Sequence, residues 1–192
     1  MTFATTDLCD DHPELLEDGR LAVLPPLFTH FGQHPRFCGK ITTLKVFEDN
    51  ALVRATLEAP GNGNVLVIDG GASLRRALVG GQLALLAQNN GWSGIVVDGC
   101  VRDSDEINAC AIGVRALATH PRKSSKLGAG ERNVRICVSG VAVQPGGLVV
   151  CRCRWHRGGA AEAGLRRAGS DSATTLRAAA GPARAERTGT RA

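Results

Sequence analysis

The chain has 192 residues, of which 24 are glycine and none is tyrosine. This length suits one domain with a buried core, and an apolar fraction of 43% with mixed charge favours a soluble globular protein. The formal net charge of +5 belongs to the last quarter, because nine arginines and three acidic residues follow Gly146, whereas 14 basic and 15 acidic residues precede it. The body is nearly neutral, which argues against direct nucleic-acid binding.

The cysteines and the N-terminus indicate a reducing compartment. Seven cysteines, an odd number, are scattered mostly inside apolar runs, as buried thiols are and disulfide frameworks are not. The first residues become acidic early and contain no uninterrupted apolar segment of signal-peptide length, and no later run has the length of a membrane span. We therefore expect a cytoplasmic protein with no membrane partner.

The first third of the chain predicts helical and extended segments in turn. TTDLCDDHPELL (residues 5–16) has helix-capping Thr and Asp, whereas LAVLPPLF (21–28) and GKITTLKVFED (39–49) are extended in pattern. NALVRATLEAPGNGN (50–64) predicts a short amphipathic helix that ends at Pro60 and Gly61.

The middle of the chain predicts a parallel strand, helix, strand unit. VLVIDGG (65–71) and GIVVDG (94–99) are continuous apolar strands, and SLRRALVGGQLALLAQNNGW (73–92) between them has a helical pattern. Ligands of such sheets bind beyond the carboxyl ends of the strands. We therefore expect a site just after these two strands.

The remainder predicts three short elements and then a change of character. DEINACAIGVRALATHP (105–121) contains a short helix and a strand, RKSSKLGAGER (122–132) is a basic loop, and NVRICVSGVAV (133–143) is a hairpin around Ser139 and Gly140. After QPGG (144–147), Ala, Arg and Gly dominate without periodicity. We interpret residues 1–146 as the domain and residues 147–192 as an aberrant, largely disordered tail.

Two features at the strand ends carry groups that could bind a ligand. Arg102 and Asp103 follow the second strand, and a guanidinium fork beside a carboxylate suits an oxo-acid and a hard divalent cation. Gly80 and Gly81 precede the helical run, where free N–H groups form an anion site. The alternatives are a surface ion pair and a plain glycine turn. The histidines and Cys151-x-Cys153 lack zinc-site spacing.

Three long stretches carry a family resemblance. They are FGQHPRFCGKITTLKVFEDNALV (31–53), GNGNVLVIDGGASLRRALVGGQLALLAQNNGWSGIVVDGCVRDSDEI (61–107) and IGVRALATHPRKSSKLGAGERNV (112–134). They closely resemble the family of regulator of ribonuclease activity A, which includes the 4-hydroxy-4-methyl-2-oxoglutarate aldolases. The resemblance implies a single α/β domain, an α/β/β/α sandwich with a small central β-barrel-like core similar to swivelling domains, assembled as a homotrimer.

The resemblance also implies an activity and its residues. It implies a lyase that uses Mg²⁺ or Mn²⁺ to cleave 4-hydroxy-4-methyl-2-oxoglutarate into two pyruvates, with oxaloacetate decarboxylation as a side activity. Carried over by position, Arg102 binds the oxo-acid, Asp103 is the metal ligand, and both are catalytic. The backbone amides that bind the substrate fall on Gly80, Gly81, Gln82 and Leu83.

The chain departs from the family pattern at two places. Aldolase members usually have Gly-Asp where this chain has Gly80 and Gly81, so one acid is missing. Family members also end in a strand resembling DWLYADADGIVV, and the codons of GLVVCRCRWHRGG (147–159), read from the second base of Gly147, can encode that strand in full. We infer an inserted nucleotide after the Gly146 codon; the alternative is a lineage-specific extension.

A second function stays open at this point. The founding name of the family implies a non-catalytic protein that binds and inhibits ribonuclease E. Asp103 favours the enzyme, whereas Gly81 in place of an acid favours the regulator.

Overall fold

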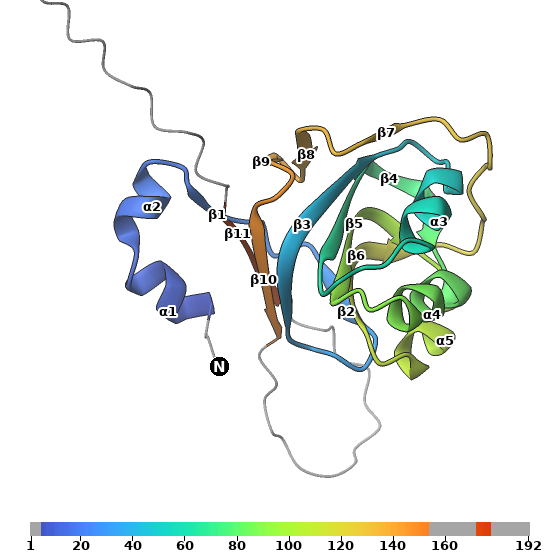
Figure 1. Ribbon diagram of the computed structural model, residues 1–192, viewed down its shortest axis with the longest axis horizontal. Coiled ribbons are helices and arrows are strands. Elements are labelled where there is room, and N and C mark those ends of the chain that lie inside the picture. Colours follow the sequence, from blue (N-terminus) through green and yellow to red (C-terminus); the bar gives the residue numbers. More distant parts are fainter. Residues whose placement is uncertain (1–4, 154–171, 178–192) are drawn as a thin grey trace, which may run out of the picture.

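A central mixed sheet, flanked by helices, organises the chain (Figure 1). The computed structural model describes residues 5–153 and 172–177. Its helices are α1 (Thr5–Asp10), α2 (Pro13–Glu17), α3 (Ala51–Leu57), α4 (Gly81–Asn89) and α5 (Ser104–Ala109). Its strands are β1 (Leu21–Val23), β2 (Thr29–Phe31), β3 (Phe37–Lys45), β4 (Val65–Val79), β5 (Gly94–Val101), β6 (Gly113–Thr119), β7 (Glu131–Arg132), β8 (Ile136–Val138), β9 (Val141–Val143), β10 (Leu148–Cys153) and β11 (Ser172–Arg177).

Four parallel strands form the middle of the sheet. The order is β1-β11-β10-β3-β4-β5-β6-β2, with β3, β4, β5 and β6 parallel and β7 paired to the end of β3. The predicted unit of two parallel strands joined by a helix is confirmed by β4, α4 and β5. No pairing joins β1 to β2 within the described ranges, so a barrel-like closure of the sheet stays a prediction.

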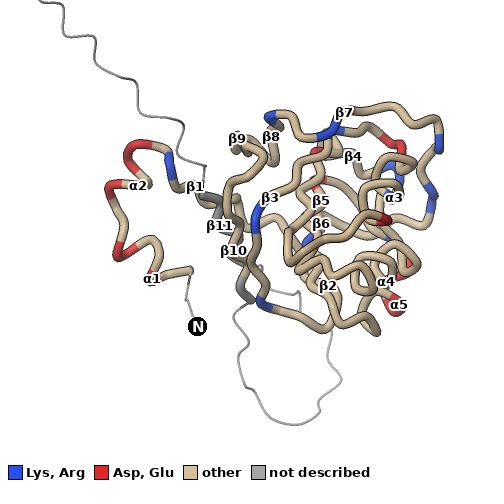
Figure 2. Tube along the Cα trace, in the orientation of Figure 1, with Lys and Arg blue, Asp and Glu red and all other residues tan. Residues whose placement is uncertain are grey.

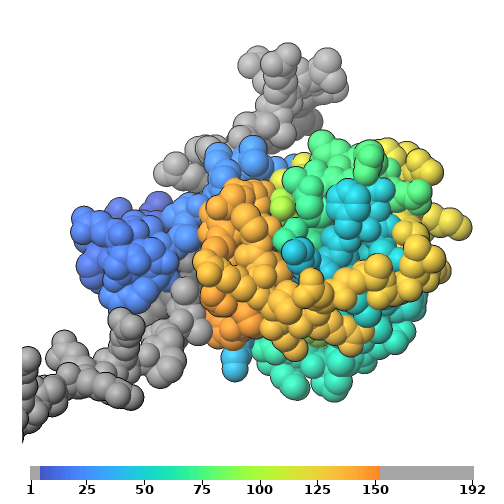
Figure 3. Space-filling view, turned by 90° about the horizontal axis from the view of Figure 1, so that it is seen from above, coloured from blue at the N-terminus to red at the C-terminus, as the bar shows by residue number. Residues whose placement is uncertain are grey.

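Apolar side chains fill both faces of the sheet. One cluster packs α3, α4 and α5 against it and includes Leu57, Leu83 and Ile107. The other lies on the opposite face, where Val67 and Val96 of the sheet meet Ile136, Val138 and Val143 of the β8–β9 hairpin. Figure 3 shows the residues of β8 to β10 in orange beside the N-terminal residues in blue. Strand β5 is buried along its whole length, as its continuous apolar run predicted.

The single mixed α/β domain predicted from the sequence is confirmed, with one local error. The helix expected over residues 73–92 begins only at Gly81, because residues 73–79 continue strand β4. The backbone of Ala77 bridges that of Lys123, and Ala77, Leu78 and Val79 are buried. These contacts with distant residues favour an extended backbone over the local helical pattern. The hairpin around Ser139 and Gly140 is confirmed by β8 and β9.

Part of the segment after Gly146 belongs to the sheet. Strand β10 pairs with β3, and β11 lies between β10 and β1. Residues 154–171 and 178–192 lie outside the described residues, so the inferred shift of reading frame stays a prediction. In the described residues no helix is long and apolar enough to cross a membrane.

Candidate functional site

The predicted site residues converge at the carboxyl ends of β4 and β5. Gly80 follows β4 directly and caps α4, while Arg102 and Asp103 follow β5 and lead into α5. The two strands are paired up to Val79 and Val101, and the backbone N–H of Arg102 donates to the Val79 carbonyl at 2.9 Å. The fold therefore brings together two loops that lie about twenty residues apart in the sequence.

Asp103 has a backbone conformation that residues other than glycine seldom adopt. Its φ of 54° and ψ of 48° lie in the left-handed region, where Asp is among the better tolerated side chains. It occupies the N-cap position of α5, yet its side chain makes no capping hydrogen bond. Its Oδ2 instead lies 3.2 Å from Nε of Arg102. The carboxylate is thus directed toward the strand-end loops rather than toward its own helix.

Absence of a side chain at Gly80 makes room for this ion pair. A Cβ there would lie 2.8 Å from Oδ2 of Asp103 and 3.3 Å from Nε of Arg102. The two side chains are 40% and 36% exposed, so the pair stabilises the fold little and stays open to a ligand. Gly80 therefore serves the placement of the predicted catalytic residues.

The donor groups present fit a magnesium-like cation that keeps much of its water. A carboxylate oxygen is the ligand that such cations prefer, and Mg²⁺ binds through one or two carboxylates and several waters. In the described ranges no group of three or more His, Cys, Asp and Glu side chains could hold a metal. Asp103 would therefore hold the cation largely through its hydration shell.

The first turn of α4 offers backbone N–H groups beside Asp103. The N–H of Leu83 donates to the Gly80 carbonyl at 3.0 Å. In the described part of the chain, the N–H groups of Gly81 and Gln82 make no backbone hydrogen bond. Together with the helix dipole these amides favour an anion. Of the four predicted substrate-binding amides, that of Leu83 is already used within the helix.

Glu106, which no sequence motif singled out, also lies in this region. A Cβ at Gly81 would overlap Cβ and Oε2 of Glu106 and lie 2.9 Å from its Cδ. The side chain of Glu106 thus occupies the space that the Cβ of any larger residue at position 81 would need. The signal in the sequence is Asp103-x-x-Glu106, the spacing of an N-terminal capping box.

Two buried carboxylates at the same edge of the sheet have a structural role. Asp69 and Asp98 are paired across β4 and β5. Asp69 accepts from the N–H groups of Gly71 at 3.0 Å and Cys137 at 3.3 Å. Asp98 accepts from the hydroxyl of Ser139 at 2.8 Å and from its N–H at 3.2 Å. These acids hold the β8–β9 hairpin against the sheet.

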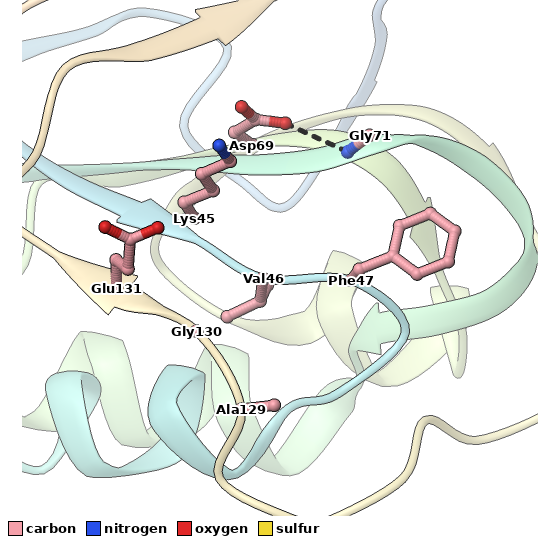
Figure 4. A pocket seen from close by; sticks show the side chains of 8 residues that line it. All are labelled: Lys45, Val46, Phe47, Asp69, Gly71, Ala129, Gly130 and Glu131. Atoms are coloured by element: carbon pink, nitrogen blue, oxygen red, sulfur yellow. Dashed lines mark hydrogen bonds between the residues drawn. The ribbon is translucent and has the colours of Figure 1, made fainter.

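A pocket of about 270 Å³ lies apart from the predicted site. Its lining residues are Lys45, Val46, Phe47, Asp69, Gly71, Ala129, Gly130 and Glu131 (Figure 4). None of the predicted site residues contributes to it. The side chain of Asp69 turns back to the N–H of Gly71, so it is already hydrogen-bonded. Asp69 is therefore not free to bind a ligand in this pocket.

The basic loop over residues 122–132 lies at the margin of the molecule (Figure 2). Arg122, Lys123 and Lys126 are in this loop, which is mostly exposed. Its backbone contacts β4, since Nη1 of Arg76 donates to the Lys123 carbonyl at 3.2 Å. This arrangement is that of a solvated loop fastened by its main chain.

The fold and the strand-end loops define a single-domain α/β protein in which the first turn of α4 lies beside the Arg102–Asp103 ion pair. The family model described as RraA-like, Aldolase/RraA, matches residues 5–152. The chain belongs to this family.

Relatives named as aldolases share most of the domain. A protein of Burkholderia multivorans named "Putative 4-hydroxy-4-methyl-2-oxoglutarate aldolase" is 62% identical over 146 residues, which are 76% of this chain and 89% of the relative. A protein of the same name from Cupriavidus taiwanensis is 59% identical over 149 residues, 78% of this chain and 90% of its own length.

Two solved structures share the fold. The RNA-processing inhibitor RraA from Thermus thermophilis has a TM-score of 0.76 at 43% identity, covering 96% of this chain and 98% of that one. A structure from Geobacillus kaustophilus, described as an S-adenosylmethionine:2-dimethylmenaquinone methyltransferase, has a TM-score of 0.74 at 38% identity, covering 92% and 96%. The same fold thus carries different functional descriptions, and the fold alone does not define the function.

Proposed function

We propose that this protein is a divalent-metal-dependent lyase that cleaves 4-hydroxy-4-methyl-2-oxoglutarate into two molecules of pyruvate. The observation that carries the proposal is the carboxylate of Asp103, which stands beside Arg102 and Gly80 and makes no capping hydrogen bond with α5. The relatives named as aldolases support the choice of substrate.

In this proposal the chain's own groups bind and orient the substrate. The guanidinium of Arg102 binds a carboxylate and the keto oxygen of the oxo-acid, and the N–H groups of Gly81 and Gln82 bind a second anionic oxygen. Asp103 would hold a Mg²⁺ or Mn²⁺ ion. When bound, this cation would polarise the keto group and offset the negative charge that develops on the keto oxygen as the bond breaks.

The proposed reaction balances without a redox partner. The hydroxyl of the substrate loses its proton and becomes the keto group of one pyruvate, while the bond between C3 and C4 breaks. The electron pair of that bond stays on C3 as the enolate of the second pyruvate, which then takes up a proton. Decarboxylation of oxaloacetate yields the same enolate, which supports it as a side activity of the same site.

A coupled assay of pyruvate formation tests the proposal. The full chain is supplied with 4-hydroxy-4-methyl-2-oxoglutarate or oxaloacetate, with Mg²⁺ or with a chelator, and Asp103→Asn is compared with Asp105→Asn. Asn tolerates the left-handed backbone of residue 103, so this change removes the charge with little strain. We expect metal-dependent pyruvate formation that Asp103→Asn abolishes and Asp105→Asn retains. Turnover that is absent, or equal in the chelator, overturns the proposal.

A second candidate function is favoured by the likeness to the RNA-processing inhibitor of Thermus thermophilis. In this alternative the protein binds ribonuclease E and inhibits RNA cleavage without catalysing a reaction. An RNA-cleavage assay with purified ribonuclease E and increasing amounts of the chain tests it. Inhibition that is equal in the wild type and in Asp103→Asn, without pyruvate formation, favours the regulator over the lyase.

We further propose that the lyase acts in the cytoplasm as a homotrimer. Cys9, Cys38, Cys100, Cys110 and Cys137 form no disulfide, which supports a reducing compartment. Burial raises the pKa of the Cys100 thiol, so it remains protonated and unreactive at neutral pH. Sedimentation equilibrium of the full chain tests the trimer.

A further inference from the structure

Arg115 carries a positive charge into the interior of the protein. It is 0% exposed and is the largest of the fully buried side chains in the described residues. Val114 and Ala116 belong to the apolar cluster on the helix side of the sheet, so Arg115 between them points to the opposite face. On that face its pair on β5, Val96, and the partly buried Leu117 belong to the second apolar cluster. The guanidinium therefore lies on an apolar face, out of contact with solvent.

Most of the hydrogen-bonding capacity of Arg115 is unused. Its Nη2 donates to the Pro35 carbonyl at 2.9 Å, whereas Nε and Nη1 have no hydrogen-bond partner among the described residues. These two nitrogens carry more than half of the N–H donors of a guanidinium. A buried donor without an acceptor destabilises the folded state, and native structures contain few such groups. An acceptor at this guanidinium would remove that cost.

Among the described residues, no acidic side chain forms an ion pair with Arg115. Asp98 stands two residues after Val96 on the same face of β5, but its two oxygens accept from the hydroxyl and the N–H of Ser139. His30, the pair of Arg115 on β2, is itself a base. Burial first and the Arg115 charge second lower the pKa of His30, so the histidine is neutral at neutral pH. A single positive charge therefore remains to be neutralised in an apolar interior, where an unpaired charge is costly.

We propose that Arg115 binds one small monovalent anion, chloride, inside the fold. An anion accepts hydrogen bonds from the guanidinium and neutralises its charge, whereas a water molecule would only accept the hydrogen bonds. A divalent anion such as sulfate would leave a buried negative charge in its place. The full burial of Arg115 favours a free ion over a carboxylate side chain from another molecule. This site is independent of the proposed lyase function, because none of the predicted catalytic or substrate-binding residues takes part in it.

The dependence of stability on chloride tests the inference. A ligand that binds only the folded state lowers the unfolding equilibrium constant as it saturates its site. Urea unfolding of the full chain is measured in sodium gluconate and in sodium chloride at the same ionic strength, because gluconate is too large for an enclosed site. We expect chloride at about 0.2 M to lower the unfolding equilibrium constant of the wild type at least about fivefold relative to gluconate.

Two variants that lose the same charge separate this site from general effects of salt. Arg115→Met replaces the guanidinium by an apolar side chain, and we expect its stability to be equal in the two salts. Arg54→Met removes an arginine of α3 whose side chain is 49% exposed, and it should keep the wild-type response to chloride. A wild type that is equally stable in both salts overturns the inference, as does an Arg115→Met variant that responds to chloride as the wild type does.

Bromide replaces chloride in a second test that needs no variant. Crystals of the wild-type chain are grown in sodium bromide, and the anomalous scattering of bromine locates the bound ions. We expect a bromide ion within hydrogen-bond distance of Nε or Nη1 of Arg115. Bromide confined to the surface of the protein, or a water molecule alone at the guanidinium, overturns the inference.

Discussion

Arg115 is a fully buried cation on β6. It lies beside His30, and burial together with this positive charge determines the charge state of the histidine. Nη2 of Arg115 donates to the Pro35 carbonyl at 2.9 Å, while Nε and Nη1 have no hydrogen-bond partner among the described residues. His30 pairs with Arg115 across β2 and β6, and its Nε2 lies 3.2 Å from the His34 carbonyl. Burial, and secondarily the Arg115 charge, lower the pKa of His30.

The lowered pKa of His30 predicts a loss of stability in mild acid. The folded state resists protonation of His30, whereas the unfolded chain takes up the proton near the ordinary pKa of about 6.5. The free energy of unfolding is therefore expected to be highest above that pH and to fall as the pH drops through the range between the unfolded and folded pKa values. His30→Gln keeps a hydrogen-bond donor and removes this titration.

Urea unfolding of both proteins between pH 5 and about pH 8 measures the effect. The stability of wild type minus that of His30→Gln should decrease toward acid. A difference that is constant with pH contradicts the assigned charge state.

Gly113 is required by an aromatic ring that crosses the sheet. An added Cβ would overlap the ring of Phe37 and lie 2.5 Å from the His34 carbonyl oxygen. Gly113→Ala is therefore expected to lower the free energy of unfolding by about 2 kcal/mol, in the range for overpacked cores. Gly99→Ala on the neighbouring strand β5 is the matched control, since its nearest contact is the end of Leu78 at 3.3 Å. Equal losses of stability in denaturant unfolding would refute the steric explanation.

At the scale of elements, the β8–β9 hairpin depends on acids of the sheet beneath it. The hairpin is small, with three residues in each strand, and such a pair is marginal alone. Asp98 is 3% exposed and receives both the N–H and the hydroxyl of Ser139 at the turn. Asp69 and Asp98 each stand at the end of an apolar run. Their hydrogen bonds to the hairpin give both acids a structural role that requires no catalytic one.

Asp98→Ala should loosen this hairpin. The change leaves two half-buried donors of Ser139 without their acceptor, so we expect a loss of about 1 kcal/mol in the free energy of unfolding. Hydrogen exchange measured by mass spectrometry should show faster exchange over residues 136–143 than in the wild type. Asp98→Asn retains an acceptor oxygen and serves as the control with a smaller effect. Unchanged exchange in Asp98→Ala would contradict the role of Asp98 in holding the hairpin.

The incorrect prediction of a helix over residues 73–79 also concerns a whole element. Leu74, Ala77 and Leu78 have helical spacing, but the side chains of Arg75 and Ser73 are held by Glu48, at 2.7 Å in each case. The hydrogen bond from Ser73 and the charge of Arg75 lower the pKa of Glu48, so it is ionised at neutral pH. These partners lie about 25 residues earlier, beyond the reach of a local pattern.

At the scale of the whole molecule, the sheet joins the two ends of the chain. Strand β11 lies between β1, near the N-terminus, and β10, which is itself paired with β3 of the central sheet. The family match ends at residue 152, and the aldolase relatives cover 76–78% of this chain but 89–90% of their own length. The family match therefore includes most of β10, beyond the domain end expected at residue 146, and the inferred change of reading frame stays a prediction.

Restoring the reading frame after Gly146 is predicted to stabilise the protein. The restored chain would continue from β9 into a strand of the family type and would lose the nine arginines of the tail, which give the chain its net positive charge. We expect it to unfold at a higher temperature than the 192-residue chain and to remain soluble to higher concentration. Differential scanning calorimetry of the two proteins measures the first effect. A lower unfolding temperature in the restored chain argues for a genuine extension.

The sequence alone determined the elements whose signals are local: the buried strand β5, the helix α4 after its glycines, the hairpin around Ser139, and the neighbouring Arg102 and Asp103. Apolar runs, glycines and adjacent charges act over a few residues, so a linear reading captures them. Only the tertiary structure decided that residues 73–79 are extended and that Glu106 occupies the space beside Gly81. Both depend on surfaces from distant parts of the chain coming into contact, which no local pattern encodes.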